Sequence, residues 1–192
     1  MQLTVLSCTV KNIEVNMPDD LPWKKTAQQL VSISDTIEVN NLHTMTYFAY
    51  ANALINGWEH KRTQYFLDQA FNYIDHNSYG LEYEWDAFGD STINSDTTNY
   101  TITITDHVGF VFLKAYQKGA ISEDAIIKLY DALSKIPFAD TLDPGVCYAY
   151  SDSPYDQIGC VHNVNASVAW FYSELSRSGF SGIKTDSIVE AI

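Results

Sequence analysis

One pattern recurs along the chain: a polar stretch that carries a histidine opens an apolar helical segment, and that segment ends at a glycine. The three copies cover residues 42–57, 106–119 and 161–179. Each glycine leads into a second, more polar helical stretch, so the unit is typical of a helical hairpin. Stacked hairpins place equivalent residues side by side. The repeat therefore predicts that His43, His107 and His162 lie at one end of a helical layer.

The spacing of apolar residues predicts a mostly α-helical single domain over residues 1–192. Helices are expected at residues 23–33, 43–56, 61–75, 106–117, 122–135 and 161–176, and a further helix from residue 185. Residues 1–20 are expected to form an extended N-terminal arm. Long polar loops are expected at 77–101 and 140–159, and the Thr-Ile-Thr-Ile-Thr run at 101–105 indicates a short strand. Loops of that length inside a compact domain are commonly functional or mobile.

The helices that open with histidine are apolar almost all round, whereas the helices that follow them are amphipathic. In this contrast the chain resembles the α/α-toroid superfamily, which includes six-hairpin glycosidases, polysaccharide lyases and terpenoid-cyclase-like proteins. The resemblance implies buried inner helices, amphipathic outer helices, and a site in the long loops at one end. The Asp-x-Asp-Asp signature of terpenoid cyclases is absent, because Pro18-Asp19-Asp20 does not fit it. The chain also has too few hairpins for a closed ring, so the resemblance implies an open arc.

The composition limits the partners of the protein. The net charge is −13, and nucleic acids, anionic membranes and polyanionic glycans would be repelled at long range. A neutral or cationic small molecule remains compatible with this charge, although acidity also serves solubility. No apolar run approaches the roughly 20 residues that span a bilayer.

The cysteines and the start of the chain bear on the compartment. Cys147 and Cys160 flank one loop and could form a disulfide, but only three cysteines are present and free thiols are expected. The first residues lack a basic segment followed by a continuous apolar segment. These features favour a cytoplasmic over a secreted protein.

The histidines are the first candidates for chemistry. A helix N-terminus lowers the pKa of a histidine, and a neutral imidazole can act as a general base or bind a substrate oxygen. We expect His107 and His162 to act in acid–base catalysis, with Asp106 and Asp152 as catalytic partners and His43 in substrate binding. The alternative is that each histidine caps its helix, and Asp106 suits an N-cap.

No metal or other cofactor is expected. Zinc sites with three histidines and an open position are known, but these histidines are far apart in the sequence and no local ligand spacing supports one. Cys160 and His162 with Cys147 or Asp152 are another conceivable ligand set. Glycine-rich phosphate loops and the Gly-x-Ser-x-Gly elbow are also missing.

Aromatic and acidic residues alternate in both long loops, which is typical of a sugar-binding cleft. Aromatic faces stack on pyranose rings, and carboxylates accept hydrogen bonds from hydroxyl groups. The alternative is aromatic packing beneath solvated acids. The expected substrate-binding residues are Tyr83, Trp85, Asp86, Tyr148, Tyr150, Asn163 and Asn165.

The leading functional hypothesis is therefore an enzyme or binding protein for a neutral, carbohydrate-like small molecule held in a loop-covered cleft. A second hypothesis is a cyclase or isomerase of an apolar substrate that uses Cys, His and Tyr side chains, which rests on analogy with other α/α-barrels. A third is a non-catalytic helical-repeat protein that binds other proteins. An arc of three hairpins would leave an apolar flank, which predicts either a homodimer or coverage by the N-terminal arm.

Overall fold

The computed structural model describes residues 22–76, 78–142, 145–157 and 159–180 and is mostly helical, as the sequence predicts. Its elements in chain order are α1 (Pro22–Ser34), α2 (Leu42–Asn56), α3 (Lys61–His76), the π-helix η1 (Thr103–Val108), α4 (Gly109–Gln117), α5 (Glu123–Leu133), β1 (Phe138–Leu142), β2 (Gly145–Tyr148), the 3-10 helix η2 (Pro154–Asp156) and α6 (His162–Arg177). The expected arm at residues 1–20 and the expected helix from residue 185 lie outside the described residues.

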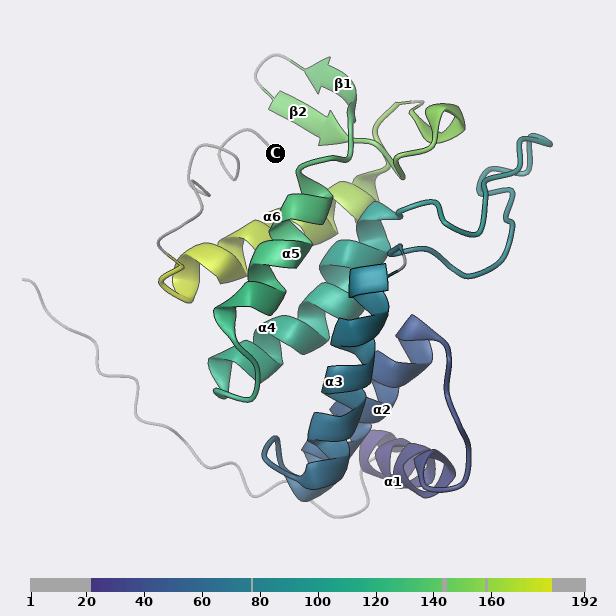
Figure 1. Cartoon of the computed structure of the whole chain (residues 1–192). Helices are drawn as coiled ribbons and strands as arrows, with labels where there is room; N and C mark the ends of the chain where they lie inside the picture. Colours follow the sequence, from purple (N-terminus) through teal and green to yellow (C-terminus); the bar gives the residue numbers. More distant parts are fainter. Residues whose placement is uncertain (1–21, 77, 143–144, 158, 181–192) are drawn as a thin grey trace, which may run out of the picture.

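The helix α2, the continuous pair η1–α4 and the helix α6 run in the same direction. Their side chains meet at successive levels: His43 with His107, Tyr50 with Phe110, Thr105 with Ser167, and Phe110 with Trp170. The amphipathic helices α3 and α5 return beside α2 and α4 (Figure 1). Two hairpins with apolar first helices are thus present, while their extension into a toroid-like arc remains a prediction.

Local sequence accounts for the limits of α2. Asn41 is its N-cap, and the Asn41 side-chain oxygen accepts a hydrogen bond from the amide of Thr44 at 2.9 Å. Gly57 ends the helix with φ +94°, a conformation that other residues rarely adopt. Between these ends, α2 buries Met45, Phe48 and Ala49 against the neighbouring helices.

The hydrophobic core lies between the α2, η1–α4 and α6 helices and the α3 and α5 helices that cover them. Each fully buried large side chain contributes on the order of 1.5–3 kcal/mol relative to an exposed one. Large, fully buried side chains of this core include Phe66, Ile104, Phe112, Leu129, Phe171 and Tyr172. This core fixes the ends of the helices, from which both long loops emerge on the same side (Figure 1).

The expected strand at residues 101–105 is wrong, because this run is helical and leads directly into η1. β-branched residues favour strands locally, but tertiary contacts satisfy these threonines in the helix. The Thr101 hydroxyl donates to the carbonyl of Ala149 at 2.7 Å, and the Thr105 hydroxyl lies 2.7 Å from Ser167. A π-helical turn is rare and often marks a functional site.

The second expected loop contains a small antiparallel hairpin, which the sequence reading missed. Strands β1 and β2 pair with Phe138 opposite Tyr148 and Leu142 opposite Gly145. The hairpin lies above the end of α5 and the start of α6 (Figure 1). Within the described part of the chain, no helix is both long and apolar enough to cross a membrane.

Candidate functional site

Two of the three repeated histidines meet between α2 and η1. The Nδ1 atoms of His43 and His107 are 3.1 Å apart, which is a hydrogen-bonding distance between imidazole rings. The rings are nearly perpendicular, with centroids 4.9 Å apart, and both side chains are half-buried. Two groups that become cationic at acidic pH are therefore held in direct contact.

Burial keeps this pair neutral. It is the main cause that lowers the pKa of His43, and the neighbouring His107 lowers it further. Burial also lowers the pKa of His107, and the opposing effect of Asp106 is smaller. A neutral imidazole pair can share only one proton between the two Nδ1 atoms, so one ring donates and the other accepts.

One of the two possible proton arrangements leaves a basic nitrogen on His107. The backbone of Gly80 raises the pKa of His43, as a nearby carbonyl does when it favours a ring N–H. No group reaches full hydrogen-bonding geometry at Nε2 of His43, although this atom is buried. With the proton on Nε2, the Nδ1 atom of His43 accepts a hydrogen bond from His107. The Nε2 atom of His107 is then left with a lone pair and can take up a proton.

Asp106 and Tyr47 adjoin the free nitrogen of this pair. The Asp106 carboxylate is 3.9 Å from Nε2 of His107, and its side chain is 55% exposed. The Tyr47 ring lies 6.3 Å from the His107 ring and is 46% exposed. Burial, together with Asp106, raises the pKa of the Tyr47 hydroxyl, so it remains a hydrogen-bond donor. The sequence reading missed Tyr47, although its position four residues after His43 on a helix would have indicated it.

His107 and Asp106 do not lie at a helix N-terminus, as the sequence had suggested. The helix begins at Thr101, so both residues are inside it and Asp106 is not its N-cap. The lowered pKa of His107 therefore comes from burial and not from the helix dipole. His43 is the second residue of α2, close to the expected position.

Glu82 connects the histidine pair to the first long loop. Its carboxylate accepts a hydrogen bond from the amide of Leu42 at 2.9 Å, next to His43. Burial and a hydrogen bond to Glu82 raise the pKa of Tyr73. Glu82 itself adopts φ +67°, a strained backbone conformation for a non-glycine residue. Tyr83 follows it and is 57% exposed.

His162 lies at a different place, at the exposed first position of α6, beside the Cys147–Cys160 disulfide. The expectation of free thiols is therefore wrong for this pair, and the cysteines no longer support a cytoplasmic location. Asn163 is also exposed.

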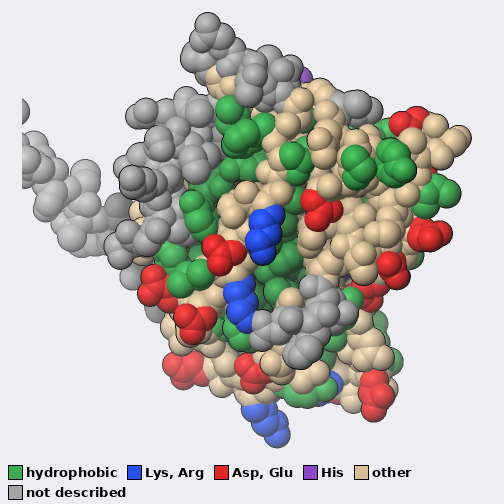
Figure 2. Space-filling model, turned by 45° about the horizontal axis from the view of Figure 1, so that its top comes forward, with side chains coloured by type: hydrophobic (Ala, Val, Ile, Leu, Met, Phe, Trp, Pro, Cys, Tyr) green, Lys and Arg blue, Asp and Glu red, His purple; other side chains and the backbone are tan. Residues whose placement is uncertain are grey.

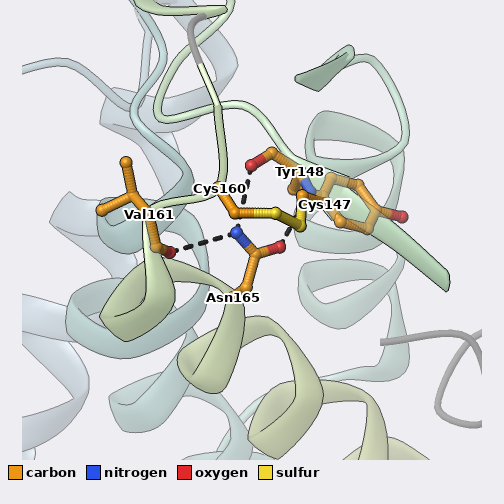
Figure 3. Close-up of a disulfide and its surroundings, with 5 residues drawn as sticks. All are labelled: Cys147, Tyr148, Cys160, Val161 and Asn165. Atoms are coloured by element: carbon orange, nitrogen blue, oxygen red, sulfur yellow. Dashed lines mark hydrogen bonds between the residues drawn. A yellow bond between two sulfur atoms is a disulfide. The ribbon is translucent and has the colours of Figure 1, made fainter. Parts of the chain in front are cut away.

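Asn165 is a structural residue. Its side-chain oxygen accepts a hydrogen bond from the Tyr148 amide at 2.8 Å. Its nitrogen donates to the carbonyls of Tyr148 and Val161 at 3.2 and 3.1 Å. Figure 3 shows this amide directly beside the disulfide, between β2 and the start of α6. The side chain is thus fully used in joining the two elements and is not free to bind a substrate.

Tyr148 is also part of the core. Its hydroxyl lies 3.0 Å from the hydroxyl of Tyr172, and both side chains are buried. Its ring packs edge-on against Phe138 with centroids 4.9 Å apart. Tyr148 therefore joins the hairpin to α6 rather than forming the wall of a cleft.

Asp152 bridges the two long loops. Its carboxylate accepts hydrogen bonds from the Asn99 amide at 2.9 Å and from the Asn99 side chain at 2.7 Å. The Asn99 side-chain oxygen in turn accepts from the amide of Tyr79 at 2.8 Å. Asp152 also lines a cavity of about 390 Å³ that neither His43 nor His107 lines.

The remaining predicted aromatic residues form one cluster where the long loops meet. The Trp85 ring packs against Tyr100 and Tyr150, at centroid distances of 5.6 and 6.0 Å, and Phe88 packs on Tyr150 at 5.3 Å. The Asp86 carboxylate stabilises its own loop, because its oxygens accept hydrogen bonds from the amides of Gly89, Asp90 and Ser91.

A buried carboxylate beneath this cluster holds the loops together. Asp156 is 2% exposed and accepts hydrogen bonds from the Asn94 side chain and the Ser151 hydroxyl, both at 2.6 Å. Asp156 belongs to the second long loop, where alternating aromatic and acidic residues favour a sugar-binding cleft on the sequence alone. Its burial and its neutral hydrogen-bond donors instead indicate a structural role, in which Asp156 links residues 94 and 151.

Among the described residues, no group of three or more His, Cys, Asp or Glu side chains is arranged to hold a metal ion. Comparison with protein-family models found no match, and comparisons with curated proteins and with solved structures found none either. The functional argument therefore rests on the geometry of the histidine pair.

Proposed function

We propose that the protein binds a neutral, hydroxyl-bearing small molecule of the carbohydrate type at the His43–His107 pair and acts on it by acid–base chemistry. The observation that supports this proposal most directly is the 3.1 Å contact between the two Nδ1 atoms. It orients a half-buried, neutral His107 with one nitrogen left as a base. Such a group can abstract a proton from a substrate at neutral pH.

The neighbouring side chains have complementary roles in this proposal. His43 positions His107 and fixes its tautomer, as does the residue that hydrogen-bonds the second ring nitrogen of a catalytic histidine. Asp106 stabilises the imidazolium that forms when His107 takes up a proton. The exposed rings of Tyr47 and Tyr83 offer surfaces on which a sugar ring can stack, and the net charge of −13 does not oppose a neutral ligand.

The test is a binding and turnover screen with neutral mono- and oligosaccharides, followed by nuclear magnetic resonance of the histidine side chains. We expect a ligand to shift the His107 resonances and His107→Ala to abolish turnover. His162→Ala is the matched variant, because His162 is an exposed helix-terminal histidine away from the pair. It should leave binding and turnover unchanged.

Loss of activity in His162→Ala with retention in His107→Ala would move the site to the disulfide end of α6. A ligand that shifts neither histidine would contradict the proposal, as would equal activity in both variants. The melting temperature of each variant separates loss of function from loss of folding.

An isomerase or cyclase of an apolar substrate is the second candidate, and one cavity favours it. A space of about 330 Å³ lies between α1 and α2, and its lining is almost entirely apolar, including Trp23, Leu30, Tyr50 and Leu54. Tyr47 lines this space and also faces His107. A substrate with an apolar body could therefore reach the same base. The screen separates the candidates when it includes apolar alcohols and ketones beside the sugars.

A further inference from the structure

A second cavity, separate from the histidine pair, lies between the C-terminal end of α3 and α5. Its volume is about 390 Å³, within the range of small-molecule sites. It is lined on one side by Lys128 and Asp131 of α5 and by Lys135 of the turn that follows α5, and Asp152 of the second long loop also lines it. This lining brings charges of both signs into one space.

The α5 wall carries more positive than negative charge. Lys128 and Asp131 are three residues apart on α5, Lys135 follows two residues after the helix ends, and all three line the same cavity. The Lys128 ammonium lies 4.1 Å from the centroid of the Phe71 ring, which holds it in place. The backbone amide of Lys135 donates to the carbonyl of Ala132, whereas its ammonium makes no hydrogen bond or ion pair with any described residue and is available.

The loop wall is negative and firmly placed. The Asp152 carboxylate receives two hydrogen bonds from Asn99, at 2.9 and 2.7 Å, and both donors are neutral. Its charge is therefore oriented but not neutralised. The cavity thus has a positive side on α5 and a negative side on the loop.

The rest of the lining is compact and partly apolar. Ile74, Ala132 and the buried Tyr79 ring supply the apolar surface. The Tyr79 hydroxyl is buried without a hydrogen-bond partner, a costly state that ligand-binding sites often retain. A ligand here has room for a short side chain beside its two charged groups.

We propose that this cavity binds a small zwitterion of the free amino acid type. Its carboxylate would pair with Lys135 and its ammonium with Asp152. A zwitterion has no net charge, so the −13 charge of the chain does not repel it, unlike a simple anion. Figure 2 shows basic side chains in the middle of one face and acidic ones mostly nearer its edges, consistent with locally mixed charge on an acidic protein.

The test compares three probes by calorimetry and amide-shift mapping: L-alanine, N-acetyl-L-alanine, which lacks the ammonium, and L-alaninamide, which lacks the carboxylate. We expect L-alanine to bind about tenfold more tightly than either blocked form, since each loses a charge-assisted hydrogen bond. The shifted amides should include those of Asn99 and Lys135. If N-acetyl-L-alanine binds as tightly as L-alanine, the cavity is an anion site. If L-alaninamide binds as tightly as L-alanine, it is a cation site. Either result, or no binding at all, would overturn the proposal.

Lys135→Gln should weaken L-alanine binding about tenfold and leave the melting temperature unchanged, because its ammonium supports no described residue. Lys118→Gln is the matched control, an exposed lysine outside this cavity, and should bind as the unaltered protein does. Unchanged binding in Lys135→Gln would contradict the assignment. Turnover of the sugar screen at His107 is measured separately, so this site and the proposed function can fail independently.

Discussion

Two junctions of the fold, α2 with η1 and β2 with α6, both contain polar residues from the starts of the repeated apolar helices. They differ in whether these polar groups have hydrogen-bond partners. Between β2 and α6, a disulfide links the two segments covalently, and both the oxygen and the nitrogen of the Asn165 amide have hydrogen-bond partners. Between α2 and η1, two histidines meet with lowered pKa values and a buried nitrogen that has no partner. The β2–α6 junction is therefore arranged for stability, whereas the α2–η1 junction retains a buried imidazole nitrogen that costs stability.

Unsatisfied buried groups therefore distinguish these two regions, although polar residues occur in both. A buried or half-buried polar atom without a partner costs stability unless it serves another purpose. Asn165 and His43 look alike in the sequence as polar residues at the start of apolar helices. Their hydrogen bonds distinguish a structural residue from a candidate binding residue.

The largest effect should come from the disulfide. Replacing both Cys147 and Cys160 with alanine should lower the free energy of unfolding by about 3 kcal/mol, since the bond closes a loop with a sequence separation of 13 residues. Urea unfolding of the double variant measures this, and reduced unaltered protein is the control. A loss below about 1 kcal/mol would show that the β2–α6 junction does not depend on the covalent bond.

Asn165→Ala should cost about 2–3 kcal/mol, because it leaves the buried Tyr148 amide without its partner and removes a donor from the carbonyls of Tyr148 and Val161. Asn163→Ala, at an exposed neighbouring position, should change stability by less than about 0.5 kcal/mol. Thermal unfolding of the two variants compares them directly. Similar losses in both would mean that the hydrogen bonds of Asn165 do not hold the β2–α6 junction.

Two tyrosine substitutions should act with opposite signs. Tyr148→Phe leaves the buried Tyr172 hydroxyl unpaired and should cost about 1–2 kcal/mol. Tyr79→Phe removes a buried hydroxyl that has no partner and should be neutral or stabilising by up to about 1 kcal/mol. Chemical denaturation of both variants tests the comparison, and a destabilised Tyr79→Phe would reveal a hydrogen bond at that hydroxyl.

Helices were the most predictable part of this fold. The expected limits of α1, α2, α3, α5 and α6 agree with the structure to within about two residues, a usual margin for helix ends. The Thr101–Thr105 run was misread because its β-branched residues favour strands, whereas contacts with Ala149 and Ser167 stabilise the helix. Those contacts come from residues distant in the sequence, which local propensity does not include.

The candidate site was predictable only in part. The repeat predicted that His43, His107 and His162 lie at one end of the helical layer, and the structure brings His43 and His107 into contact while His162 lies beside the disulfide. It could not show that Asp86 and Asn165 use their side chains within the fold, because hydrogen bonds to backbone groups depend on the final positions of the loops. It also could not show the contact of Asn99 with Asp152, which joins two loops 53 residues apart.

The neutral state of the histidine pair is the central claim, and a titration of His43 by nuclear magnetic resonance tests it most directly. We predict a pKa of His43 below 6.5 that rises in His107→Gln, because His107 contributes to lowering it. The folded protein then holds protons less tightly than the unfolded chain, so its stability is full above about pH 6.5 and falls as the pH drops toward the lowered value. A pKa of His43 at or above 6.5, or one that His107→Gln leaves unchanged, would contradict the account.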